Sequence, residues 1–255
     1  TKLTQQRYFL SFAYNGTAYH GWQKQANAIS VQQDIENALS LLLGESTELL
    51  GAGRTDTGVH AKQMFAHFDS SKELDGVDIV HRLNSFLGED IAFFGLYAVS
   101  QKAHARFSAT YREYEYHLHF EKDPFKEKRS FYFRRKLDRE RMNEAAHCLL
   151  NYSEFSAFTR SNDGASNHRC DLMKSEWQHF QNSSIFTIRA NRFLRNMVRA
   201  IVGTLLEVGE GRLSINEFEK IIESGDRRMA GESAPAHGLY LTEIGYPKEI
   251  TACLK

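Results

Sequence analysis

The pattern of apolar and polar positions in the first hundred residues predicts a mixture of strands and helices. Residues 7–14 are rich in β-forming side chains and end at an Asn-Gly turn signal, which predicts a strand. A helix is predicted from the capping residue Ser30 to the terminating Gly44, because apolar residues recur there on one helical face. Further strands are predicted at 47–53, 63–69 and 91–100, and a second helix at 77–87.

The second half of the chain repeats this order of elements. Residues 111–120 alternate with period two, which predicts a strand that carries Tyr114 and Tyr116 on one face. Helices are predicted at 138–150, 193–208 and 214–224, and strands at 170–180, 184–191 and 237–246. The pattern therefore predicts an α+β protein of two ferredoxin-like halves, each of β-α-β-β-α-β order. We place the N-terminal half at 1–102 and the C-terminal half at 103–255.

The composition is that of a globular protein that does not enter a membrane. Of the 255 residues, 42% are hydrophobic and 25% are charged, and no apolar run approaches the roughly 20 residues that a transmembrane helix needs. The first residues lack the layout of a signal peptide. Three widely spaced cysteines, at 148, 170 and 253, favour neither a disulfide framework nor a zinc site. We therefore expect a cytoplasmic protein without a metal.

Charge is balanced over the whole chain but not along it. The net charge is zero, so bulk charge indicates no nucleic-acid partner. Residues 102–141, however, hold 12 Lys and Arg against 7 Asp and Glu, whereas the flanking parts are slightly acidic. On charge alone, a solvated face is the favoured explanation. A local phosphate-binding surface is the alternative, and the mixture of cations and aromatics at 125–136 is typical of RNA-binding surfaces.

Residues 51–61, GAGRTDTGVHA, hold the most conspicuous candidate for chemistry. Asp56 follows a predicted strand and lies between Gly53 and Gly58, so it belongs to a loop that a ligand can approach. Spacing alone supports a turn aspartate and a reactive carboxylate equally. Arg54 favours the ionised form, which is the form that acts as a nucleophile or a general base.

Two known loop types share parts of this motif but fit poorly. Aspartic proteases use two D-T-G loops that share a proton, whereas this chain has one such loop and a large helical content. A phosphate-binding P-loop would need G-x-x-x-x-G-K-[ST] followed by a helix, and neither is present.

The motif resembles the signature of the TruA family of tRNA pseudouridine synthases, in which the aspartate is the catalytic residue. Four further segments resemble the family in order along the chain: YNGTAYHGWQKQ at 14–25, HARFSATYREYEYHL at 104–118, FLRNMVRAIVGTLLEVG at 193–209 and APAHGLYLTEIGYP at 234–247. Together the five segments span nearly the whole chain. Thr57 departs from the family pattern, in which alanine is usual.

The resemblance implies a pseudouridine-synthase-type mixed sheet with a central cleft between the two halves. It also implies an enzyme that isomerises uridine to pseudouridine in the anticodon stem-loop of tRNA, at positions 38, 39 and 40 in tRNA numbering. The N-glycosidic bond breaks and the base rejoins the sugar through C5, with neither a cofactor nor a metal. Family members work as homodimers, so tRNA and a second copy of this chain are the expected partners.

Three residues match the family's functional positions, and a fourth, Arg54, lies beside one of them. Asp56 matches the catalytic nucleophile, which either attacks the sugar or removes a sugar proton; both roles need the ionised carboxylate. Arg199 matches the basic partner of that aspartate, and Tyr114 matches the tyrosine that stacks on the target base. We expect Arg54 to fill the space that the flipped uridine leaves. From pattern alone, Arg199 would be a snorkelling arginine on an apolar helix, and Tyr114 a core residue.

Two rival functions remain to be weighed. The first is an RNA-binding protein that has lost its activity, but Asp56, Tyr114 and Arg199 are all present. The second is a pseudouridine synthase for ribosomal RNA, and the five segments argue against it. His60 and His67 are expected to be structural or RNA-contacting, because the family chemistry does not require histidine.

Overall fold

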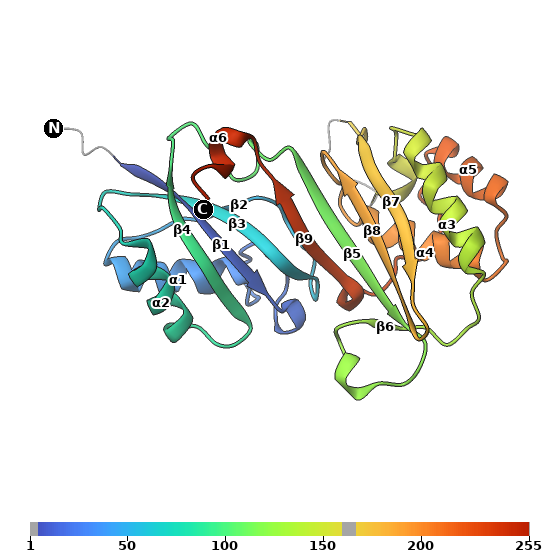
Figure 1. Cartoon of the computed structure of the whole chain (residues 1–255), viewed down its shortest axis with the longest axis horizontal. Helices are drawn as coiled ribbons and strands as arrows, with labels where there is room; N and C mark the ends of the chain where they lie inside the picture. Colours follow the sequence, from blue (N-terminus) through green and yellow to red (C-terminus); the bar gives the residue numbers. More distant parts are fainter. Residues whose placement is uncertain (1–4, 160–166, 255) are drawn as a thin grey trace. The chain divides into compact units, whose positions relative to one another are not determined.

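The computed structural model describes residues 5–159 and 167–254, which divide into two compact α+β units (Figure 1). The first unit comprises the chain up to residue 110 together with residues from 241 onward, and the second comprises 111–240. Within the described residues there are nine strands and six α-helices. Strand β9, Leu239–Gly245, begins in the second unit and ends in the first.

The first unit is built around a central antiparallel strand. Strand β1, Gln6–Tyr14, lies between β3, His60–Ser70, and β4, Ile91–Val99, and pairs with both. Six of the nine residues of β1 are buried and the other three are partly buried. Helix α2, Gly76–Phe86, packs against β4, and α1, Val31–Leu43, contacts α2. The short helix α6, Lys248–Thr251, follows β9.

Helix α1 has the ends that the sequence predicts. The hydroxyl of Ser30 accepts a hydrogen bond from the N–H of Gln33, so it caps the first turn. Gly44 ends the helix in the left-handed conformation, with φ of 66°. Both predicted ends of the helix are therefore confirmed.

The strand predicted at 47–53 is much shorter than expected. Strand β2 covers only Leu50–Gly51, where it pairs with β3. Side chains of α1 occupy the backbone groups just before it: Glu36 accepts from the N–H of Leu49 at 2.9 Å, and Gln32 donates to its carbonyl at 3.0 Å. The backbone of Leu49 is therefore bonded to helix side chains instead of a neighbouring strand.

Within the residues described, the second unit has strands of its own and three α-helices. Strand β8, Ser183–Ala190, lies between β5, Tyr111–His119, and β7, Leu172–His179, and is antiparallel to both. The short β6, Phe131–Tyr132, pairs parallel with β5. Helix α3, Arg139–Cys148, packs on β7 and contacts α4, Met197–Gly209, and α5, Ile215–Ser224. The largest fully buried side chains of this unit are Tyr116, Phe155, Phe158, Phe186 and Phe218.

The helix predicted at 193–208 begins four residues later than expected. Asn196, the residue before α4, has φ of 66° and is therefore left-handed rather than helical. Its amide donates to the hydroxyl of Ser233 at 2.6 Å, which holds this conformation. The apolar run thus enters the core through a turn before the helix starts.

The α+β class predicted from the sequence is confirmed, whereas the ferredoxin-like description of each half stays a prediction. No helix in the described ranges has the length and apolar character to cross a membrane.

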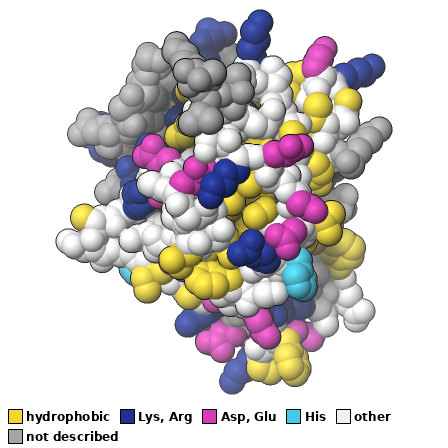
Figure 2. Space-filling view, turned by 90° about the vertical axis from the view of Figure 1, so that its left-hand side faces the viewer, with side chains coloured by type: hydrophobic (Ala, Val, Ile, Leu, Met, Phe, Trp, Pro, Cys, Tyr) yellow, Lys and Arg dark blue, Asp and Glu magenta, His cyan; other side chains and the backbone are white. Residues whose placement is uncertain are grey.

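Figure 2 shows one face of the molecule, on which apolar side chains form several small groups separated by charged ones of both signs.

Candidate active site

Asp56 lies in the loop between β2 and β3 of the first unit, and its side chain is half-buried. The N–H of Val59 donates to the carbonyl of Asp56 at 3.1 Å, which closes a four-residue turn. The third residue of this turn, Gly58, has φ of 79°, a left-handed conformation that favours glycine. The turn is thus closed by the backbone of Asp56 and does not require its carboxylate.

The segment 14–22 holds this loop on the residues that flank the aspartate. The hydroxyls of Tyr14 and Thr55 lie 2.8 Å apart, and the carbonyl of Thr55 accepts from the N–H of Trp22 at 3.2 Å. On the other side, the N–H of Gly58 donates to the carbonyl of Tyr19 at 3.3 Å. The residues before and after the aspartate are therefore fixed by a segment that lies far away in the sequence.

Gly21 and His60 each have a structural role near the contact between this loop and the segment 14–22. Gly21 has φ of 86°, and a Cβ there would lie 2.4 Å from the carbonyl oxygen of Thr55, so a side chain would push the loop away. His60 is 3% exposed, and its Nδ1 accepts a hydrogen bond from the N–H of Gly16 at 3.1 Å. His60 therefore anchors the end of the loop, as a structural residue does.

Arg54 and Thr57, the other candidate positions of the motif, are both exposed. Among the residues that the structure describes, none forms a hydrogen bond or an ion pair with the side chain of either residue. Arg54 thus presents its charge to solvent beside the aspartate loop. Nothing in the structure explains the threonine.

Tyr114 lies on β5 of the second unit, opposite Ile188 of β8. The residue is partly exposed, and its ring packs edge-on against Phe193, with ring centroids 5.0 Å apart. Tyr116, two residues further on, is fully buried and donates its hydroxyl to the carbonyl of Pro235 at 2.7 Å. Burial raises the pKa of Tyr116. Tyr116 is therefore a core residue, whereas Tyr114 is more exposed than a core residue.

Arg199 lies in the first turn of α4 and is half-buried. Its Nε donates to the carbonyl of Ala234 at 2.7 Å, and its own carbonyl accepts from the N–H of Ala234 at 3.0 Å. Burial, and then the charge of Arg199, lower the pKa of His237, which is therefore neutral at pH 7. A snorkelling arginine would not be held in this way by the backbone of a neighbouring segment.

The position of Arg199 is electrostatically unusual for a structural cation. The N-terminus of a helix carries a partial positive charge, which disfavours a cation and favours an anion. The first turn of α4 contains no acidic residue. This end of α4 therefore combines two sources of positive potential and is suited to an anionic partner.

The four candidate residues thus fall in two places. The first unit holds Arg54 and Asp56 on one loop, and the second unit holds Tyr114 and Arg199. The anchoring role of Tyr14 was not predicted, although the closely spaced glycines and aromatics of YNGTAYHGWQ were a signal for a tightly packed loop. A structural role was one of the two roles expected for His60, and the contact with Gly16 agrees with it.

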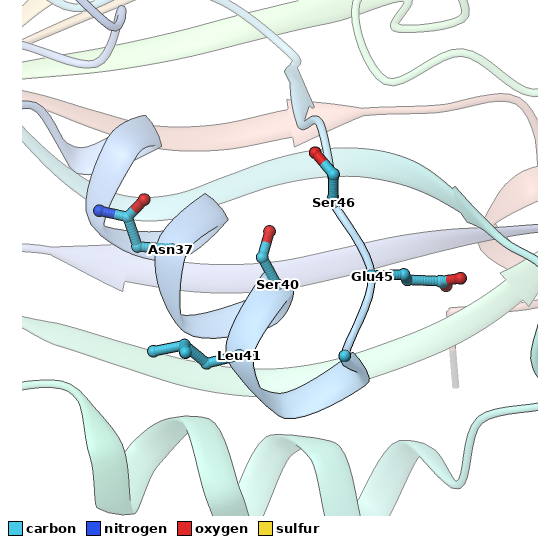
Figure 3. A pocket seen from close by; sticks show the side chains of 6 residues that line it. Asn37, Ser40, Leu41, Glu45 and Ser46 are labelled. Carbon is cyan, nitrogen blue, oxygen red and sulfur yellow. The ribbon is translucent and has the colours of Figure 1, made fainter.

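Within the described residues, neither a surface hollow nor a cluster of metal-ligating side chains offers a competing site. The hollow lies at the end of α1 and is lined by Asn37, Ser40, Leu41, Gly44, Glu45 and Ser46 (Figure 3). Its one titratable side chain, Glu45, accepts hydrogen bonds from the hydroxyls of Ser70 and Ser71. Within the described ranges, no group of three or more His, Cys, Asp or Glu is arranged to hold a metal ion.

Comparison with known proteins places the chain in a family. A family model described as tRNA pseudouridine synthase matches residues 149–247. The tRNA pseudouridine synthase A of Bacteroides fragilis is 48% identical over 250 residues, which cover 97% of this chain and 99% of that protein. The proteins of the same name from Azobacteroides pseudotrichonymphae and Acetivibrio thermocellus are 46% and 40% identical, over 96% and 93% of this chain and 98% of each relative. The chain therefore belongs to the tRNA pseudouridine synthase A family.

Proposed function

We propose that this protein isomerises uridine to pseudouridine in the anticodon stem-loop of tRNA, at positions 38, 39 and 40, with Asp56 as the nucleophile. One observation carries the proposal: relatives named tRNA pseudouridine synthase A match this chain over nearly its whole length. The position of Asp56 on a loop that is fixed from both sides supports its role.

The reaction conserves every atom of the nucleotide. The N1–C1′ bond breaks, the uracil turns, and a C5–C1′ bond forms. C5 loses its proton and N1 gains one, so the product is an isomer of the substrate and no oxidant or reductant takes part. Asp56 acts as an ionised carboxylate, because a protonated carboxyl is neither a nucleophile nor a base.

The loop geometry supports catalysis through preorganisation. A reactive group that is held in place before the substrate binds loses less entropy in the transition state. The contacts of Tyr14 and Trp22 with Thr55, and of Tyr19 with Gly58, restrain the backbone on both sides of the carboxylate. A turn alone would leave this backbone without such restraints.

Arg199 and Tyr114 are assigned by resemblance and Arg54 by its position beside Asp56, and their surroundings support these assignments. We propose that Arg199 pairs with the carboxylate of Asp56, because the helix end that carries it is suited to an anion. Tyr114 stacks on the target uracil, since its ring is flat and the residue is partly exposed. Arg54, exposed beside Asp56, fills the space of the flipped nucleotide, whose extrusion costs a few kcal/mol.

The expected context of the enzyme follows from the same resemblance. We propose a homodimer that acts on tRNA in the cytoplasm, with a cleft between two ferredoxin-like halves. The three cysteines, which form no disulfide in the structure, are compatible with a reducing compartment.

Release of tritium from tRNA that carries C5-labelled uridine tests the activity directly. The wild-type protein should release tritium, and Asp56→Asn should lower the rate by about a thousandfold or more while it still binds tRNA. The control is Thr57→Ala, which alters an exposed neighbour and should leave the rate within about threefold. Wild-type protein that binds tRNA without releasing tritium would instead indicate an RNA-binding protein. Equal release by Asp56→Asn would remove the aspartate from its role.

The same assay tests Arg54. Arg54→Ala should slow modification of folded tRNA, because the vacated space in the stem is no longer filled. An Arg54→Ala protein that modifies folded tRNA at the wild-type rate would contradict this role.

A further inference from the structure

Phe107 presents an aromatic ring to solvent on a segment that is otherwise tightly built. Its side chain is 76% exposed, whereas Ala105, two residues earlier, is fully buried. Exposure of a large apolar side chain forgoes the stabilisation that its burial would give. An aromatic ring that is exposed and held in a fixed position is therefore a candidate for a binding function.

A closed turn sets the orientation of this ring. The Nδ1 of His104 accepts hydrogen bonds from the N–H groups of Arg106 and Phe107, at 3.1 and 3.2 Å. The backbone N–H of Ser108 donates to the carbonyl of His104 at 2.9 Å, and the Ser108 hydroxyl accepts from the N–H of His104 at 3.0 Å. The rings of His104 and Phe107 lie 4.4 Å apart, so the histidine also supports the phenylalanine from one side.

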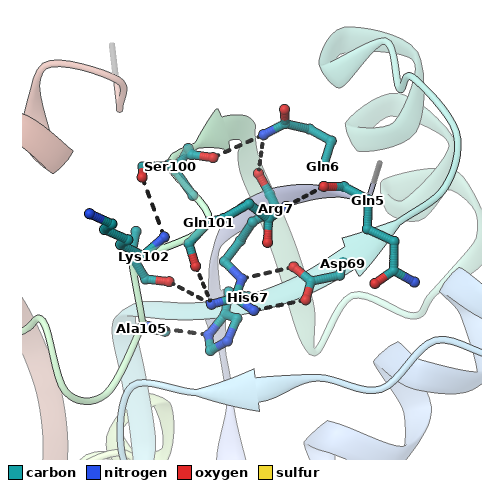
Figure 4. A network of polar contacts seen from close by, with 11 residues as sticks. Gln5, Gln6, Arg7, His67, Asp69, Ser100, Gln101, Lys102 and Ala105 are labelled. Atoms are coloured by element: carbon teal, nitrogen blue, oxygen red, sulfur yellow. Dashed lines mark hydrogen bonds and ion pairs between the residues drawn. The ribbon is translucent and has the colours of Figure 1, made fainter. Parts of the chain in front are cut away.

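This turn, residues 104–108, is itself anchored to the sheet of the first unit. The N–H of Ala105 donates to Nδ1 of His67 at 3.1 Å, and its carbonyl accepts from the hydroxyl of Tyr246 at 2.7 Å. Arg7, which forms a two-bond ion pair with Asp69 at 2.8 Å, donates to the carbonyls of residues 101 and 103 (Figure 4). The backbone that precedes Phe107 is thus held by two strands, β1 and β3, and by Tyr246, which follows β9.

The surroundings of the ring favour RNA over a protein. The guanidinium carbon of Arg106 lies 5.6 Å from the ring centroid of Phe107, and Gln101 and Lys102 are exposed nearby in the sequence. Aromatic and arginine side chains are common in protein interfaces as well, but lysine is depleted there, and an aromatic beside an arginine is also the usual platform for an unpaired base, so the exposed Lys102 favours RNA. The segment also begins the stretch 102–141, which carries a net positive charge.

We propose that Phe107 and Arg106 form a platform on which an unpaired base of the bound tRNA stacks, with the guanidinium beside the neighbouring phosphate. The inference rests on the proposed function, because it names a binding position for the same substrate. The platform contributes to tRNA affinity and takes no part in the isomerisation itself.

Binding of an anticodon stem-loop transcript to variants of Phe107 tests the platform. Phe107→Leu keeps an apolar side chain but removes the flat face, and should raise the Kd about 5- to 100-fold. Phe107→Tyr keeps the face and should bind within about threefold of wild type. Phe107→Trp should lose indole fluorescence on binding, because a stacked base quenches the introduced ring; both native tryptophans, Trp22 and Trp177, are buried.

The control is Phe94→Leu, which changes another exposed phenylalanine of the first unit, 59% exposed, and should leave the Kd unchanged. An unchanged Kd for Phe107→Leu would overturn the platform, even if wild-type protein releases tritium normally. A change of oligomeric state in Phe107→Leu, measured by sedimentation, would assign the ring to a second copy of this chain instead. Absence of tritium release by the wild-type protein would refute the proposed activity. The platform is decided by the ratio of the Kd of Phe107→Leu to that of the wild type.

Discussion

At the scale of single residues, His67 couples the stability of the first unit to pH. It is 2% exposed and accepts the N–H of Ala105, and its pKa is lowered from 6.5 to about 4. Burial is the largest cause, followed by the positive charge of Arg7 and the proximity of His104. The folded protein therefore holds His67 neutral at a pH at which an unfolded chain would protonate it.

The sign of the resulting pH dependence follows from these two pKa values. Between pH 6.5 and 4 the unfolded chain binds a proton that the folded chain does not, so the free energy of unfolding falls as the pH falls. His67 should account for up to about 3 kcal/mol of this loss by pH 4. Urea unfolding at pH 7 and pH 4.5 measures the difference.

The matched variant is His67→Asn, whose side-chain oxygen can replace Nδ1 as the acceptor but cannot be protonated in this range. It should lose less stability than wild type between the two pH values. His20→Asn, at an exposed histidine, should behave as wild type does. An identical pH dependence of wild type and His67→Asn would show that another group controls the transition.

At the same scale, the candidate site shows what spacing alone leaves undecided. Asp56 is both a turn residue and a candidate nucleophile, because its backbone carbonyl closes the turn while its carboxylate is a different group. The bond between Tyr14 and Thr55 joins residues 41 positions apart. No local pattern of apolar and polar positions encodes such a contact, so the pairing of Tyr14 with Thr55 was out of reach of the sequence.

At the scale of elements, helix α4 depends on a close approach at Gly203. A Cβ at this position would lie 1.7 Å from the carbonyl oxygen of Glu232, so the helix and the following segment would have to separate. Gly203→Ala should lower the free energy of unfolding by about 1 to 3 kcal/mol, although alanine is the better helix former. Urea unfolding checks the sign.

Gly88→Ala is the matched control, because a Cβ there would meet nothing within 4 Å. It should leave stability nearly unchanged. The separation of α4 from the segment that holds Ala234 would also disturb Arg199, so Gly203→Ala should slow tritium release as well. A stable and fully active Gly203→Ala protein would show that the two segments adjust without cost.

The elements themselves were largely predictable, and their ends less so. Period-two alternation located β5 and helical periodicity located α1, since both patterns arise from one buried face. The predicted start of α4 was wrong because the apolar run begins before the helix does, and only the left-handed Asn196 marks the boundary. The length of β2 was wrong because side chains of α1 take the backbone groups of Leu49.

At the scale of the whole molecule, the α+β class followed from the order of elements, whereas the packing partners of the chain's last residues did not. The N–H of Ile244 donates to the side chain of Gln63, which lies 181 positions earlier, and Tyr246 bonds to Ala105. These residues belong to the first unit, although the second unit separates them from the rest of it in sequence. Packing across such separations depends on tertiary structure rather than on periodicity.

With tRNA as the proposed substrate, the positive segment 102–141 predicts a salt-dependent affinity for tRNA that is concentrated there. Arg134, Arg135 and Lys136 are exposed, but their surroundings differ. Arg135 forms an ion pair with Glu210, whose side chain is only 6% exposed, whereas the Arg134 guanidinium lies 5.1 Å from the ring of Tyr132. A cation that is already neutralised by a carboxylate releases fewer counterions from RNA than one that is not.

Binding of tRNA measured over a range of salt concentrations therefore should distinguish these three cations. Arg134→Gln and Lys136→Gln should each weaken binding and reduce the slope of log K against log salt by about 0.7 to 0.9, the value for one phosphate contact. Arg135→Gln should change the slope less, because Glu210 holds that charge. Lys220→Gln, at an exposed cation of α5, should change neither quantity. An unchanged slope in Arg134→Gln and Lys136→Gln would mean that the positive segment is a solvated face, and that tRNA is held elsewhere.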